Sequence, residues 1–129
     1  MNFMISLFRI KNMAEPAIVL GQLDQLDPEN RLKGIEVNAD LDDPIEVERL
    51  YAYGHLLKAR HKKLQIHSPH GFSRLYNETS VLDKYLSIYA DLAKELQTCL
   101  SITIHPVESD QKEKARFHTL KLITRLISI

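Results

Sequence analysis

The sequence predicts an α/β domain in which parallel strands alternate with helices. Four short runs rich in apolar and β-branched residues are separated by longer segments whose apolar side chains have helical spacing. Strands connected by helices of this length form right-handed crossover units, and the strands therefore run parallel. The 129 residues suffice for one domain and contain no linker, so we expect a single domain over residues 1–129.

The elements follow in a regular order. We expect strands at Asn2–Phe8, Lys33–Ala39, Lys63–Ser68 and Leu100–His105. A helix is expected after each strand, over about Glu15–Leu26, Asp43–Arg60, Ser80–Leu96 and onward from Asp110. Asp43-Pro44-Ile45-Glu46 is typical of a helix start, with Asp43 as N-cap and Glu46 three positions later. The loop Pro69–Ser80 is longer than most connections.

Each predicted strand has one apolar and one polar or small face. Side chains alternate along a strand, so Leu100, Ile102 and Ile104 share one face of the fourth strand, and Ser101, Thr103 and His105 share the other. A parallel sheet with helices on both sides is apolar on both faces. These strands instead suit helices on one face only, as in a TIM barrel. We therefore predict an α/β fold that is a (βα)4 half of a TIM barrel.

Composition narrows the function classes. Hydrophobic residues at 44% and charged residues at 26% are ordinary for a globular domain. Lys plus Arg and Asp plus Glu number 17 each, which gives no basic excess for phosphates and counts against a nucleic-acid partner without excluding one. The one cysteine, Cys99, forms no internal disulfide, and the apolar N-terminal run is too short for a membrane span. A cytoplasmic protein with no membrane partner is expected.

Polar side chains gather at the carboxyl ends of the predicted strands, where such folds build their active sites. The polar faces contribute Glu36, Asn38, Gln65, His67, Thr103 and His105. His67 and His105 each end a strand and are followed within two residues by proline, which stops the ladder. We expect both histidines to face one cleft; the alternative is a hydrogen-bonded pair on the sheet rim. In the long loop, His70 and Arg74 are candidates for substrate contact or for solvent exposure.

Three short motifs occur in a fixed order: Gly34-Ile35-Glu36-Val37-Asn38, Ile66-His67-Ser68-Pro69 and Ile104-His105-Pro106. In order and spacing they resemble the xylose isomerase-like TIM barrels. That group includes sugar phosphate isomerases/epimerases and the endonuclease IV type of abasic-site nuclease. The resemblance covers nearly the whole chain, which corresponds to strands one to four of an eight-stranded barrel.

The resemblance implies roles for individual residues. It assigns His67 and His105 to the metal centre or the substrate, and it matches Glu36 to an acidic catalytic position at the end of the second strand. The metal would be a divalent ion (Zn, Mn or Mg). Further carboxylates of the family come mainly from strands five to eight, so half of a site is expected here. The polar face and the long loop add the candidates for substrate binding, Asn38, His70 and Arg74.

Three hypotheses for the function follow. The first is a truncated or split sugar phosphate isomerase/epimerase-like protein, an enzyme for a small sugar or polyol once a partner or a longer chain completes the site. The second is a non-catalytic half-barrel that pairs with its own copy or with a complementary half-barrel, because an open parallel sheet leaves two edges exposed. The third is a fragment of an endonuclease IV-like nuclease, against which the neutral charge counts.

Overall fold

Four parallel strands form one sheet. The structure, a computed structural model, describes residues 1–7, 9–67, 79–104 and 112–128. Within these residues the strands are β1 (Phe3–Leu7), β2 (Leu32–Val37), β3 (Lys63–His67) and β4 (Leu100–Thr103). They pair in the order β1-β2-β3-β4, and every pairing is parallel.

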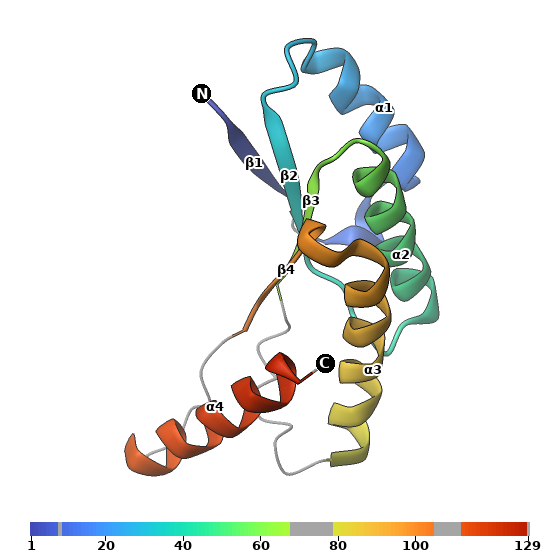
Figure 1. Cartoon of the computed structure of the whole chain (residues 1–129). Coiled ribbons are helices and arrows are strands. Elements are labelled where there is room, and N and C mark those ends of the chain that lie inside the picture. The colour runs from blue at the N-terminus through green and yellow to red at the C-terminus, as the bar shows by residue number, and fades with distance from the viewer. Residues whose placement is uncertain (8, 68–78, 105–111, 129) are drawn as a thin grey trace.

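The helices lie on one side of this sheet. In the described residues they are α1 (Pro16–Leu26), α2 (Pro44–Ala59), α3 (Thr79–Leu96) and α4 (Lys112–Ile127), with the short 3₁₀ helices η1 (Ile10–Asn12) and η3 (Gln97–Cys99). Figure 1 shows α1, α2 and α3 in one layer against the sheet, with α4 set at an angle away from them. The predicted class, an α/β fold of four βα units, is confirmed, and the arrangement is compatible with half of a TIM barrel.

The strands end earlier than the sequence predicts. The end of β2 is Val37 and not Ala39, because the carbonyl of Asn38 accepts the Ile10 N–H at 3.3 Å and so belongs to the η1 contact. The end of β4 is Thr103. Ile104, predicted as part of this strand, lies outside it, and His105 is outside the described residues, as is most of the predicted loop Pro69–Ser80.

The apolar core lies between the sheet and the helix layer. Alternate side chains of the two central strands point toward the helices and are almost fully buried, namely Ile35, Val37, Leu64 and Ile66. They pack against buried side chains of the two central helices, which are Leu50, Tyr53 and Leu57 of α2 and Leu82 and Tyr89 of α3. Burying one such side chain stabilises the fold by ~1.5–3 kcal/mol. The helix-covered face therefore holds the fold together and leaves the opposite face to polar residues.

The helical spacing of Val19, Leu23 and Leu26 predicts one apolar stripe on α1, and α1 buries only part of that stripe, together with Leu20. Val19 is buried and Leu23 is partly buried, but Leu26, predicted in the same stripe, is 80% exposed. Leu26 is the last residue of α1, and Asp27 caps the helix before the chain turns toward β2. The helix therefore ends before its stripe reaches the core at this position, and the prediction for Leu26 is wrong.

Helix α2 begins as its sequence predicts. The Asp43 side chain is the N-cap and accepts the N–H of Ile45 at 2.9 Å, and Pro44 occupies the first turn. Glu46 differs from the expected capping box, because its carboxylate accepts the N–H of Asp40. This buried carboxylate therefore fixes the loop between β2 and α2.

Helix α2 ends in a left-handed turn. The N–H of His61 bonds to the carbonyl of Lys58 at 3.0 Å, and the N–H of Lys62 bonds to the carbonyl of Leu57 at 2.9 Å. This pair of bonds is the Schellman motif, which places its central residue in the left-handed region. That residue is His61, with φ of 55°. A position that favours glycine thus holds a histidine.

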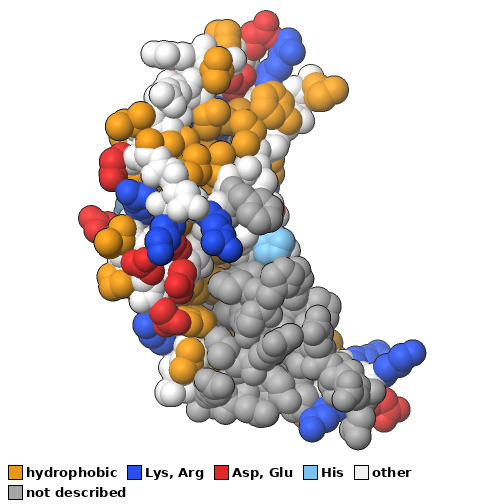
Figure 2. All heavy atoms as spheres, turned by 180° about the vertical axis from the view of Figure 1, so that it is seen from behind, with side chains coloured by type: hydrophobic (Ala, Val, Ile, Leu, Met, Phe, Trp, Pro, Cys, Tyr) orange, Lys and Arg blue, Asp and Glu red, His pale blue; other side chains and the backbone are white. Residues whose placement is uncertain are grey.

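The whole molecule is curved. Figure 2 shows a crescent outline that is hollowed on one side, the side occupied by the sheet in Figure 1. Hydrophobic side chains gather in the same view over the upper part of the molecule, to which β1 and α1 belong.

In the part of the chain that the structure describes, no helix has both the length and the apolar character that crossing a membrane requires.

Candidate functional site

A row of hydrogen-bonded polar side chains crosses the face of the sheet that the helices leave open. Ser6 Oγ of β1 donates to Glu36 Oε1 of β2 at 3.0 Å. Gln65 Nε2 of β3 donates to Glu36 Oε2 at 2.9 Å and also to Thr103 Oγ1 of β4 at 2.9 Å. Every strand therefore contributes one side chain, and Glu36 lies at the middle of the row.

Strand register explains why these four side chains meet. Ser6 pairs with Glu36, and Glu36 pairs with Gln65, so these residues are direct neighbours across parallel strands. Thr103 is the register partner of His67, and Gln65 reaches it diagonally. A slip of one residue in any pairing would turn the polar side chain toward the helices. The apolar face of each strand therefore determines where the polar row lies.

His67 extends this row toward the carboxyl end of the sheet. Its Nδ1 lies 3.7 Å from Glu36 Oε1, so an imidazole and a carboxylate face each other on neighbouring strands. The side chains of His67 and Glu36 are 30% and 26% exposed, which leaves both partly accessible to a ligand. The predicted proximity of Glu36 and His67 on one polar face is therefore present.

The carboxylate of Glu36 keeps capacity for a ligand. Each of its oxygens has about two acceptor positions. Oε1 receives the Ser6 hydroxyl and Oε2 receives the Gln65 amide. One further donor can bind at each oxygen without displacing these two hydrogen bonds. The row is therefore a preorganised acceptor for hydroxyl groups.

The other predicted site residues are placed in part or not at all. Asn38 follows β2 directly and is half-buried, and its backbone carbonyl receives the Ile10 N–H. His70, Arg74 and His105 lie outside the described residues, so their predicted roles stay predictions. The expected pair of His67 and His105 is represented by His67 alone.

The loop after β2 is tied to α3 by a second polar cluster. Asp42 accepts hydrogen bonds from the Tyr85 hydroxyl and from Lys84 Nζ, the latter at 3.0 Å. These donors, Tyr85 first, hold the pKa of the Asp42 carboxyl below its ordinary value. Burial, together with the Asp42 carboxylate, raises the pKa of the Tyr85 hydroxyl to about 12. This cluster positions the connection that leads from the candidate site into α2.

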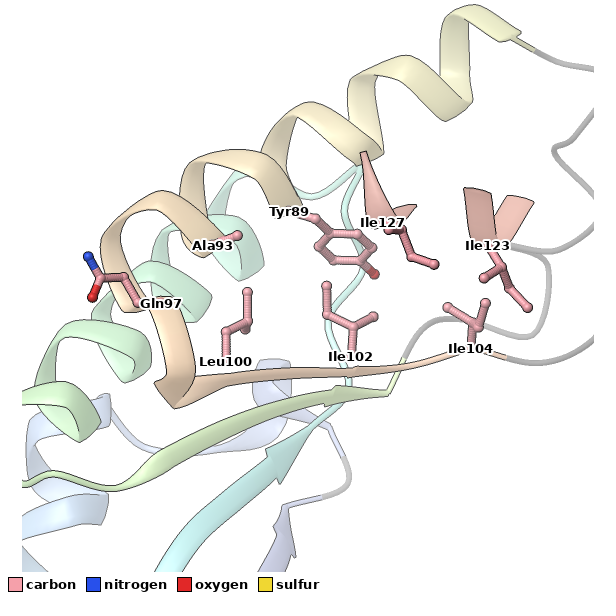
Figure 3. Close-up of a pocket in the computed structure, with 8 residues that line it drawn as sticks. All are labelled: Tyr89, Ala93, Gln97, Leu100, Ile102, Ile104, Ile123 and Ile127. Carbon is pink, nitrogen blue, oxygen red and sulfur yellow. The ribbon is translucent and has the colours of Figure 1, made fainter. Parts of the chain in front are cut away.

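A cavity of about 330 Å³ lies on the opposite side of the sheet from the polar row. Figure 3 shows it between α3, β4 and α4, with Tyr89, Ile102 and Ile123 among the side chains that point into it. Ile102 belongs to the helix-facing set of β4, whereas Thr103 belongs to the polar set. This cavity is apolar and contains none of the predicted site residues.

Comparison of the chain with family models, with curated proteins and with solved structures gives no match. The likeness of its motifs to the xylose isomerase-like barrels therefore stays a prediction from the sequence.

Sequence reasoning found the polar face but not all of its connections. Alternation places Ser6 on the polar side of the first strand, but it does not indicate that Ser6 donates directly to Glu36. Gln65 was placed on the polar face, but its bridge between Glu36 and Thr103 depends on the side-chain conformation. The usable signal was alternation, because the polar residue of each strand marks the face on which these contacts form.

Proposed function

We propose that the polar row is half of a binding site for a small sugar or polyol, and that the completed site carries isomerase/epimerase-like chemistry. The observation that supports this most is the Glu36 carboxylate, which is bonded from both neighbouring strands and lies beside His67. Hydroxyl groups are both donors and acceptors. A row that offers a carboxylate, an imidazole, an amide and hydroxyls matches such a ligand better than it matches a purely apolar one.

Glu36 has the chemistry of a general base in this proposal. A base removes a proton from a carbon next to a carbonyl group. Isomerisation returns the proton to the neighbouring carbon, and epimerisation returns it to the opposite face of the same carbon. The Ser6 and Gln65 donors hold the Glu36 carboxylate in place for this transfer. His67, 3.7 Å from the same carboxylate, orients or protonates an oxygen of the ligand.

The described residues do not by themselves fit the divalent metal that the resemblance implies. A catalytic zinc site takes about three protein ligands, whereas Glu36 and His67 supply two, and the described residues contain no group of three or more metal-binding side chains. We therefore assign no step to a metal. Ligation by His67 and His105 stays a proposal for the completed site, tested by titration with Zn²⁺, Mn²⁺ or Mg²⁺ before and after His67→Ala.

The proposal is tested by titrating the chain with a panel of aldoses, ketoses and their phosphates, followed by calorimetry. Glu36→Gln keeps the shape of the side chain and removes its charge, so we expect affinity for the best ligand to fall roughly tenfold or more, the value of a charge-assisted hydrogen bond. The matched control is Glu48→Gln on the exposed face of α2, which should bind like the parent chain. Binding that is equal in the two variants, or absent from the parent chain with every sugar, would contradict the proposal.

The proposal also places this chemistry in the cytoplasm. Its support is the cysteine content, because the single Cys99 leaves the fold independent of an internal disulfide and hence of an oxidising compartment.

A further inference from the structure

Both edges of the sheet are open in the described residues. The strand order runs from β1 to β4, so β1 and β4 each pair on one side only. An edge strand presents backbone donors and acceptors that another strand can bind. Because all four strands are parallel, a second copy can extend the sheet beyond β4 with its own β1 and keep every strand parallel.

The β1 edge carries apolar side chains that the helix layer does not fully cover. Phe3, which pairs with the buried Leu32, is 43% exposed, and Ile5 and Leu7, which pair with the buried Ile35 and Val37, are only partly buried. No residue of β1 is charged, and α1, the helix that follows it in the chain, has a single charged residue, Asp24, which is bound by Arg60 of α2. A surface without free charge is typical of the centre of a protein interface.

Helix α4, which follows β4, has an apolar stripe that is only partly covered by the rest of the chain. Leu120, Ile123 and Ile127 lie on one side of α4 because they are three, four or seven residues apart. Ile123 and Ile127 point into the cavity above β4 (Figure 3). Ile127 is nevertheless largely exposed, and Leu120 is 54% exposed. The stripe therefore extends beyond the surface that β4 and α3 offer it.

The exposed area of the chain suggests that one copy is incomplete. A compact monomer of 14.9 kDa exposes about 7,000 Å², whereas this chain exposes 8246 Å². The excess of ~1,200 Å² exceeds the ~800 Å² that each partner loses in a standard protein interface. A second copy that covers both edges would remove surface of this size.

We propose that two copies of this chain close one eight-stranded parallel barrel, in which β4 of each copy pairs with β1 of the other and α4 covers that joint. The inference rests on the proposed function, since it names the partner that completes the site. The two joints are identical and related by a two-fold axis. Closure brings two polar rows around one axis, so the site contains Glu36 and His67 from each copy.

The first test is the mass of the chain in solution by analytical ultracentrifugation, where twice 14.9 kDa is expected. Phe3→Lys and Leu120→Glu each place a charge in a joint and should give a monomer with an unchanged circular dichroism spectrum. The matched control is Ile45→Glu, which changes an apolar side chain with 64% exposure on α2, away from both edges, and should stay dimeric. A monomeric parent chain, or a dimer that survives both joint variants, would overturn the proposal.

Mixing the two joint variants tests the geometry directly. A pair made of one Phe3→Lys chain and one Leu120→Glu chain has one unchanged joint and one joint in which lysine meets glutamate. We expect the mixture to dimerise although neither variant does so alone. Failure of the mixture to associate would exclude the exchange of β1 and β4 edges.

The dimer and the sugar site can fail separately. A monomer whose sugar binding depends on Glu36 would leave the proposed function standing and overturn the barrel. A parent dimer that becomes monomeric in both joint variants but binds no sugar would support the barrel and contradict the proposed function.

Discussion

At the scale of single residues, Glu36 and Tyr85 illustrate how the surroundings assign a role to a polar group. Glu36 receives one donor from each neighbouring strand and stays partly accessible, which suits a ligand-binding carboxylate. Tyr85 is buried and donates to Asp42, which suits a structural hydroxyl. The two residues differ in exposure more than in hydrogen bonding, and exposure decides which of them a ligand can reach.

Tyr85 makes the stability of the fold sensitive to alkali. Its pKa of about 12 lies above the ordinary 10.0, so its stabilising effect is complete below pH 10 and is lost as the pH rises toward 12. We expect Tyr85→Phe to lose less of its unfolding free energy than the parent chain between pH 10 and 12. Urea denaturation at a series of pH values measures this.

Tyr51 and Tyr53 also have raised pKa values, Tyr51 by burial and then Asp91, and Tyr53 by burial above all. Part of the alkaline loss should therefore persist in Tyr85→Phe. If Tyr85→Phe loses as much unfolding free energy between pH 10 and 12 as the parent chain does, Tyr85 does not contribute to that loss.

At the scale of elements, the left-handed end of α2 is a position where the sequence opposes the backbone. A residue other than glycine pays about 1–2 kcal/mol in this region, and glycine loses about 0.5–1 kcal/mol more chain entropy on folding. We therefore expect His61→Gly to raise the free energy of unfolding by ~0.5–1 kcal/mol, measured by urea denaturation at neutral pH. His61 is exposed, so the change removes no core contact.

The same substitution within α2 provides the control. His55 lies in the middle of the helix, where glycine is less favourable than histidine by roughly a few tenths of a kcal/mol. His55→Gly should therefore destabilise the chain, and it also removes the pair with Glu95. Destabilisation by both substitutions would contradict the assignment of strain to His61.

The elements could be predicted from the sequence because their signals are local. Asp43 and Pro44 mark the start of α2, and the alternation of Ile35, Val37 and their polar neighbours marks β2 and its two faces. The helix-facing side of the sheet follows from the same alternation. Local pattern was sufficient for this part of the fold because the period of the apolar residues reports the element and its buried face together.

The parts that could not be predicted depend on contacts between distant segments. Leu26 continues the stripe of α1 in sequence, but the helix ends before that side chain meets the core. The bridge formed by Gln65 required the register of β3 with β4 and the rotamer of a long side chain. None of these is encoded in a short window of residues.

At the scale of the whole molecule, association should couple to folding. A dimer that is more stable than its separated chains unfolds at a temperature that depends on chain concentration. We expect the melting temperature of the parent chain to rise with concentration and that of Leu120→Glu to stay constant. Calorimetric scans over a wide range of concentration measure both, and a parent melting temperature independent of concentration would contradict the association.

Gly34 determines how deep the polar face is. A Cβ at this position would lie 2.6 Å from the backbone oxygen of Lys63 and 2.8 Å from Met4 Cε, so the methionine covers the space that a side chain would take. Met4 and Gly34 pair one layer before Ser6 and Glu36, toward the amino-terminal end of the strands. Met4 forms an apolar contact beneath the carboxylate, beside Lys63, which is the register partner of Gly34. In a closed barrel Met4 would lie between the Glu36 carboxylate and the amino-terminal end of the strands, and His67 would lie on the other side of the carboxylate, toward the carboxyl end.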